Sequence, residues 1–126
     1  MNGRKYGIDV LITSLPGEPY SLGVLMCAVA TAATNSKIIY LGNDNPIEGI
    51  INSANNNKPN LIVLSISHFM STDVAEGMLS KIRNKVSNKA LIVTGGKGSP
   101  YNVPNVSFIP DFEKYYELLI RLNRQR

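Results

Sequence analysis

Hydrophobic residues occur in five short runs along the chain, and each run predicts a β-strand. The runs are mostly continuous and rich in β-branched residues, which is typical of parallel strands covered on both faces. The expected strands are Ile8–Thr13, Lys37–Leu41, Leu61–Ser65, Ala90–Thr94 and Val106–Ile109. Apolar residues at intervals of three and four predict helices after the first three strands and after the fifth.

Three of the expected helices have a start signal. Asn45 and Pro46, with Glu48 following, resemble a capping box with proline in the first turn. Ser71 is a good cap for the third helix, with Asp73 in its first turn. The fourth helix begins after Asp111. The periodic apolar positions are Leu22, Leu25, Met26, Val29 and Ala33 in the first helix, Val74, Met78, Ile82 and Val86 in the third, and Phe112, Tyr116, Leu119 and Ile120 in the fourth.

This order of elements predicts a single α/β domain over residues 1–126, with a flavodoxin-like five-stranded parallel sheet and helices on both faces. The expected strand order is 2-1-3-4-5, in which the loops after strands 1, 3 and 4 are neighbours at the switch point where such sheets bind ligands. Those same loops carry the unusual residues, at 16–23, 65–67 and 95–96. We therefore expect a ligand site there.

Composition narrows the class of protein. The 126 residues are 44% apolar and 17% charged, as in an ordinary globular domain, and a good share of the net charge of +4 lies near the two ends of the chain. We expect no direct contact with nucleic acid, because that needs a clustered basic face. No run of 18 apolar residues is present, so no membrane span is expected. The lone Cys27 suits the cytoplasm, and we expect it to be a small buried hydrophobe.

The first loop does not fit the common phosphate-binding motifs. It lacks the three-glycine spacing of a dinucleotide site, and the chain has no Walker A lysine motif. Glu18 lies near the amino end of the first helix, where a carboxylate is stabilised. Gly23 is suited to the close approach of a large flat group or of another backbone. The alternative is that Gly17 and Gly23 only shape a turn.

Three motifs in these loops resemble the cobalamin-binding domain family, especially its regulatory branch. The family has Asp-x-His-x-x-Gly after strand 1, Ser-x-Leu after strand 3 and Gly-Gly after strand 4. This chain has Glu18-x-Tyr20-x-x-Gly23, then Ser65-x-Ser67, then Gly95-Gly96. The resemblance extends over roughly residues 7 to 120. The cofactor-binding residues that it implies are Glu18, Tyr20, Ser21, Leu22, Gly23, Ser65, Ser67, Gly95 and Gly96.

The resemblance also implies roles for some of these residues. Gly23 would line a channel for the nucleotide tail of cobalamin, and Ser65 would hydrogen-bond the dimethylbenzimidazole of that tail. The Gly95-Gly96 pair would let the tail pass close to the backbone. Tyr20 stands where the family has the histidine that ligates cobalt, and a phenol with a pKa of about 10 is a poor neutral ligand. Cobalt would then have no protein ligand, or another group such as His68 would bind it, or the domain would have abandoned cobalamin.

The expected function is that of a non-catalytic cobalamin- or corrinoid-binding regulatory or sensor domain. Nothing in the chain resembles a nucleophile–base pair or a paired-carboxylate site. The alternatives are a degenerate protein-interaction module, a sensor for haem or another tetrapyrrole, in which a phenolate would ligate ferric iron, and a carrier subunit of a cobalamin-dependent enzyme. Regulatory relatives cover the upper face of the corrin with a helical cap, which this chain lacks. We therefore expect a protein partner or self-association to cover the cofactor.

Overall fold

The computed structural model describes residues 7–18, 22–42, 44–67 and 70–125. Its five strands form one sheet in the order β2-β1-β3-β4-β5, and every neighbouring pair is parallel. The strands are β1 (Asp9–Ser14), β2 (Lys37–Gly42), β3 (Leu61–Ser65), β4 (Leu91–Gly95) and β5 (Ser107–Phe108). The predicted fold class and strand order are confirmed. The fifth strand is shorter than expected, because the backbone N–H of Val106 turns back to the carbonyl of Val103.

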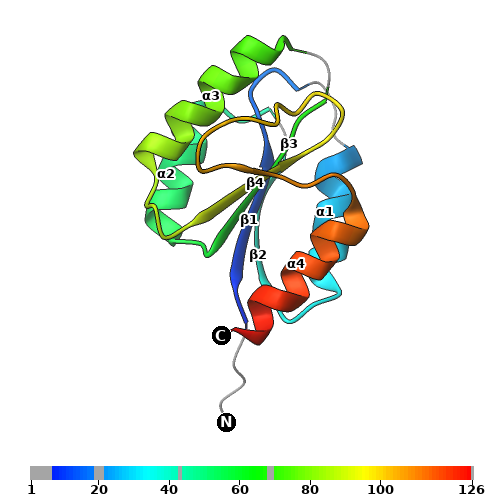
Figure 1. Ribbon diagram of the computed structural model, residues 1–126. Coiled ribbons are helices and arrows are strands. Elements are labelled where there is room, and N and C mark those ends of the chain that lie inside the picture. Colours follow the sequence, from blue (N-terminus) through cyan, green and yellow to red (C-terminus); the bar gives the residue numbers. More distant parts are fainter. Residues whose placement is uncertain (1–6, 19–21, 43, 68–69, 126) are drawn as a thin grey trace.

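Helices cover the sheet on both faces (Figure 1). They are α1 (Leu22–Ala32), α2 (Ile47–Asn57), α3 (Thr72–Lys85) and α4 (Phe112–Arg124). We call the side covered by α2 and α3 the closed face, and the side covered by α1 and α4 the open face. No helix among the described residues is long and apolar enough to cross a lipid bilayer.

Two of the three predicted helix starts are confirmed. The Ser71 hydroxyl accepts a hydrogen bond from the Val74 N–H, and the Asp111 carboxylate accepts one from the Lys114 N–H at 2.8 Å. The capping box at Asn45 is wrong. Pro46 is the capping residue of α2 and makes no side-chain cap bond, because the Asn45 amide instead donates to the Leu41 carbonyl at the end of β2.

The buried faces of the helices match the predicted periodic positions only in part, since Ile82, Val86 and Leu119 are buried as expected. In α3 the buried residues are Ala75, Leu79 and Ile82, whereas Val74 is exposed. In α4 they are Tyr115, Leu118 and Leu119, whereas Phe112 and Tyr116 are partly exposed. In α1 they are Val24, Cys27 and Thr31, whereas Leu22, Leu25, Met26 and Val29 are exposed. Since nearly every α1 residue is apolar or glycine, spacing alone could not identify the packed side of that helix.

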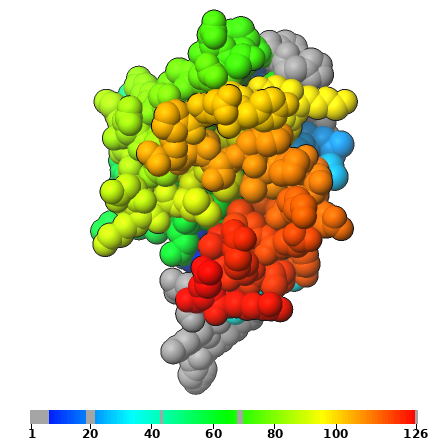
Figure 2. Space-filling view, in the orientation of Figure 1, coloured from blue at the N-terminus to red at the C-terminus, as the bar shows by residue number. Residues whose placement is uncertain are grey.

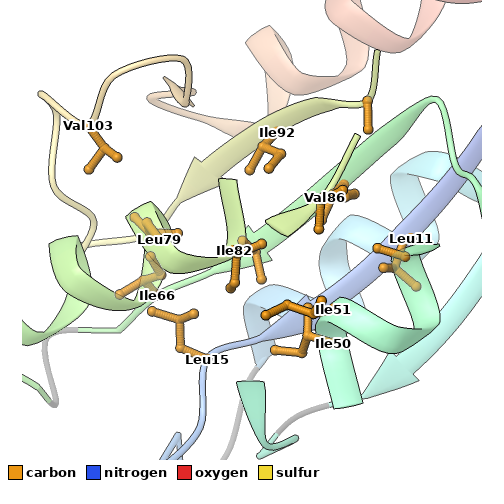
Figure 3. Packing of buried hydrophobic residues seen from close by; sticks show 14 of the residues in the cluster. Leu11, Leu15, Ile50, Ile51, Ile66, Leu79, Ile82, Val86, Ile92 and Val103 are labelled. Atoms are coloured by element: carbon orange, nitrogen blue, oxygen red, sulfur yellow. The ribbon is translucent and has the colours of Figure 1, made fainter. Parts of the chain in front are cut away.

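The closed face holds a continuous core of aliphatic side chains. Leu11, Ile50, Leu79 and Ile82 are fully buried within it, and Figure 3 shows them facing one another between the sheet and the helices. Ile66, just past the end of β3, belongs to the same cluster. This core fixes the positions of β1 and β3, and therefore of the loops that follow them.

Candidate functional site

A cavity of about 510 Å³ lies on the open face, at the carboxyl ends of β3 and β4. Its floor is built from two register pairs, Val63 opposite Val93 and Ser65 opposite Gly95. Because alternate residues of a strand point to the same face, both pairs face α1 and α4. Gly95 allows the Ile109 carbonyl oxygen to approach the floor closely, since a Cβ there would lie 3.3 Å from that oxygen.

Helices α1 and α4 form the walls of this cavity. Leu22, Gly23 and Met26 line it from the first turns of α1, and Phe112 and Tyr115 line it from α4. The rim comes from the segment between β4 and α4, which includes Gly96, Lys97 and Tyr101. Figure 2 shows this segment, coloured yellow to orange, across the front of the molecule above α4.

The polar groups deep in the walls are neutral, and the hydroxyls of Thr31 and Tyr115 are hydrogen-bonded to each other. Thr31 donates to the Cys27 carbonyl, so its hydroxyl oxygen is left to accept from the Tyr115 phenol at 2.7 Å. Burial raises the pKa of the Cys27 thiol to about 12, and burial also raises the pKa of the Tyr115 phenol. Cys27 is buried, as predicted. The inner cavity is therefore apolar and uncharged at neutral pH.

Glu18 forms a clamp between the loop after β1 and the loop after β3. Its side chain is only 1% exposed, and its two carboxylate oxygens accept hydrogen bonds from the backbone N–H and the hydroxyl of Ser67, the former at 2.7 Å. In the same loop, the Gly17 N–H donates to the Asp44 carboxylate. The serine at position 67, which departs from the family motif, thus has a structural reason: it satisfies a buried carboxylate.

Gly96 is required by the fold itself. Its φ is +107°, and a Cβ at this position would lie 2.2 Å from the Ile66 carbonyl oxygen. The same carbonyl accepts from the Gly98 N–H at 3.1 Å, and the Ile66 N–H donates to the Gly95 carbonyl at 2.8 Å. The glycine pair therefore lets the loops after β3 and β4 pack backbone against backbone, which the sequence motif alone does not reveal.

The structure brings most of the predicted site residues together. Leu22, Gly23, Ser65, Gly95 and Gly96 all line the cavity. Glu18 and Ser67 form the clamp beside it. Tyr20, Ser21 and His68 lie outside the described residues, so their placement stays a prediction. Within the described part of the chain, no group of three or more His, Cys, Asp or Glu side chains could hold a metal ion.

Sequence reasoning missed the floor and the far wall of the cavity. Val63 and Val93 lie two residues before Ser65 and Gly95 on the same strands. The alternation of strand side chains is a sufficient signal for them, once the two motif positions are placed on one face. Tyr115 has no such signal, because it comes from α4, which lies far from both strands in the sequence.

Comparison with known proteins relates the fold to proteins that bind corrinoids. No family model and no curated protein sequence matches the chain. A novel cobalamin-binding protein from Desulfitobacterium hafniense DCB-2 is 15% identical, with a TM-score of 0.76 over 91% of this chain and 58% of that one. The methanol:cobalamin methyltransferase complex MtaBC from Methanosarcina barkeri is 13% identical, with a TM-score of 0.81 over 98% of this chain and 49% of that one.

A third structure agrees with these two. The monomethylamine corrinoid protein of Methanosarcina barkeri is 16% identical, with a TM-score of 0.73 over 90% of this chain and 57% of that chain. The present chain thus spans about half the length of the solved structures that it matches. At these identities the likeness concerns the fold alone. The chain has the flavodoxin-like fold that these cobalamin-binding and corrinoid proteins share.

Proposed function

We propose that this domain binds a corrinoid and seats the nucleotide tail in the open-face cavity. The observation that carries the proposal is the convergence of Gly23, Ser65 and Gly95 on one apolar cavity. Each of the three belongs to a different one of the three loop motifs, and the motifs lie far apart in the sequence. The shared fold supports the same interpretation.

The residues present fit a corrinoid tail. The cavity volume of about 510 Å³ falls within the range of about 300–1,000 Å³ that is usual for small-molecule sites. Val63 and Val93 offer a flat apolar floor for an aromatic base, and the Ser65 hydroxyl can donate to one ring nitrogen. Lys97 at the rim places a cation where a tail phosphate can be reached. Bound cobalamin would supply a cobalt centre whose ligation is visible in its absorption spectrum.

We infer a non-catalytic, regulatory or sensor role from Tyr20. A phenol must lose a proton, with a pKa of about 10, before it ligates well, so we expect no Tyr20–cobalt bond at neutral pH. Tyr20→His is the test of this step. The visible spectrum of cobalamin bound to the variant should differ from that of the parent complex, and identical spectra with tight binding in both would mean that position 20 does not face cobalt.

The binding experiment compares ligands with and without a tail. Cyanocobalamin should bind the parent chain, and cobinamide, which lacks the nucleotide tail, should bind much more weakly. Gly23→Leu should abolish the difference, because the leucine fills the channel beside α1. Gly77→Leu is the control, since a side chain at Gly77 meets open space on α3. Failure of cyanocobalamin to bind would reduce the domain to a protein-interaction module, and haemin in the same titration tests the haem alternative.

A protein partner on the open face is the second part of the proposal. Leu22, Leu25, Met26 and Val29 of α1 are all more than 40% exposed. Leu22 and Met26 also line the cavity, so a partner packed on α1 would sense or alter its occupancy. A carrier subunit of a cobalamin-dependent enzyme would need such a partner as well. The molar mass from light scattering, with and without cobalamin, distinguishes self-association from a monomer that binds a different protein.

A further inference from the structure

The outer edge of β2 is one of the two edges of the sheet, and within the described part of the chain β2 has a neighbouring strand on one side only. We propose that two copies of this chain pair there, β2 against β2 in the antiparallel sense, about a two-fold axis. The sheet would then continue from one copy into the other, with both α1 helices on the same face. This edge lies apart from the cavity, so the inference goes beyond corrinoid binding and does not depend on it.

The two edges of the sheet are protected to different degrees. The edge strand β5 has only two residues, and its Phe108 ring packs edge-on against Tyr101. The edge strand β2 has six residues, and Lys37 at its start is its one charged residue. The rest of β2 has neither a charge nor a proline, which are common devices that keep an edge strand from pairing. The register with β1 shifts only opposite the last residues of β2, so the strand is regular up to Tyr40.

The backbone of β2 presents a self-complementary pattern at this edge. The Lys37 N–H donates inward, to the Ile8 carbonyl of the neighbouring chain segment at 2.9 Å. Because backbone groups alternate along a strand, Ile39 also turns toward β1, and Ile38 and Tyr40 turn their N–H and carbonyl groups to the outer edge. An antiparallel copy with Ile39 on the two-fold axis pairs Ile38 of each copy with Tyr40 of the other. Each such pair exchanges both of its N–H···O bonds, so the outward groups of these two residues are all satisfied.

The side chains of β2 fit the same register. Ile38 packs against the cluster on the open face and Ile39 against the cluster on the closed face, so Tyr40 lies on the open face with Ile38. Ile38 of one copy would therefore oppose Tyr40 of the other, a favourable pair of a β-branched and an aromatic side chain. Lys37 at the start of β2 and Asp44 just past its end are both exposed. Antiparallel pairing brings the Lys37 end of one copy to the Asp44 end of the other, which is complementary in charge.

Helix α1 adds an apolar surface beside the strand edge. Its cavity-lining residues lie on the flank toward β3 and β4, so the opposite flank faces β2. That opposite flank carries Leu25, Ala28 and Ala32 at spacings of three and four. Leu25 is 45% exposed, and Tyr40 on the same face is 48% exposed. A stable interface buries roughly 1,000 Å² or more, and this uncharged patch adds its area to that of the strand pair.

The first test measures the dissociation constant of the dimer by sedimentation of the chain over a range of concentrations, without cobalamin. Tyr40→Lys places a charge against Ile38 of the other copy and should raise that constant by about 10-fold or more. Tyr116→Lys is the matched control, because it makes the same change at a 40% exposed position on α4 and should leave the constant unchanged. A parent chain that is a monomer at every concentration would overturn the inference and leave corrinoid binding untouched.

The second test reads the register by cross-linking in a Cys27→Ala background. Ile39→Cys should form a disulfide between two copies under mild oxidation, because residue 39 faces itself across the axis with Cα atoms about 4.5 Å apart. Lys37→Cys is the control, since its two copies would lie roughly 14 Å apart and should not cross-link. A dimer that ignores Tyr40→Lys and does not cross-link through position 39 would overturn the inference. A dimer with the expected responses that binds no cobalamin would support it and contradict the proposed function alone.

Discussion

The helices on the two faces of the sheet differ in how far their apolar residues are buried. On the closed face, Ala75, Leu79 and Ile82 of α3 are completely buried, and charged residues cover the outside of that helix. On the open face, α1 has no charged residue, and Leu22 and Val29 are 56% and 72% exposed. Both faces bury a hydrophobic cluster, and the larger of the two lies on the closed face. The open face gives up part of its hydrophobic stabilisation, and in return it has a cavity and an uncovered apolar helix.

The largest expected effect follows from this contrast. Leu79→Ala removes a side chain from the filled core and should lower the free energy of unfolding by about 2–5 kcal/mol. Leu25 of α1 is 45% exposed, so Leu25→Ala should lower the free energy of unfolding by less than about 1 kcal/mol. Urea denaturation of both variants measures the difference. Equal losses would mean that α1 is packed as tightly as α3.

The next largest effect is expected at the clamp between the loop after β1 and the loop after β3. Ser67→Ala removes the hydroxyl that donates to the Glu18 carboxylate and should cost about 1.5–3 kcal/mol, because a hydrogen bond to a charged group is lost. Cobalamin binding should weaken as well, because Leu22 and Gly23, which line the cavity, follow the loop that carries Glu18. Ser80→Ala in α3 is the control and should leave both quantities nearly unchanged. A parent-like urea midpoint for Ser67→Ala would show that the clamp contributes nothing.

Two glycine-to-alanine substitutions compare the crowded loop after β4 with the open surface of α3. Gly96→Ala forces a side chain against the Ile66 carbonyl at a positive φ and should cost about 1–3 kcal/mol. Gly77→Ala, inside α3 with open space around it, should stabilise by about 0.5–1 kcal/mol. The two variants carry the same chemical change, so opposite signs in thermal unfolding test the local geometry. Stabilisation by both would contradict the close approach of the loops after β3 and β4.

The smallest effect is a difference in alkaline stability. The cluster on the closed face contains no titratable side chain, whereas the open face contains Cys27 and Tyr115. The folded pKa of Cys27 is raised from 9.0 to about 12, so its contribution is complete below pH 9 and is lost as the pH rises from 9 toward 12. The free energy of unfolding should fall by up to about 1.4 kcal/mol per pH unit for this thiol. Cys27→Ala should flatten the decline between pH 9 and 10, and an unaltered slope would place the thiol in contact with water.

The sequence was sufficient for the architecture because each parallel strand is a continuous apolar run, and a short chain allows few arrangements of five such strands. It also placed Gly23, Ser65 and Gly95 near one another, since Ser65 and Gly95 end β3 and β4 and Gly23 opens the helix that follows β1. It failed where the outcome depends on contacts across space. The packed side of α1 could not be identified in a helix that is apolar all round. The role of Gly96 depends on the Ile66 carbonyl, which is distant in the chain.

The most direct measurement of the central claim is methyl NMR of the chain with and without cobalamin. An aromatic base on the cavity floor would shift the methyl signals of Val63 and Val93, with Leu79 and Ile82 on the closed face as internal controls. The account predicts large shifts at the two valines with cobalamin, small shifts with cobinamide, and none at the closed-face residues. Bound cobalamin that leaves Val63 and Val93 unshifted, or that shifts Leu79 and Ile82 instead, would contradict it.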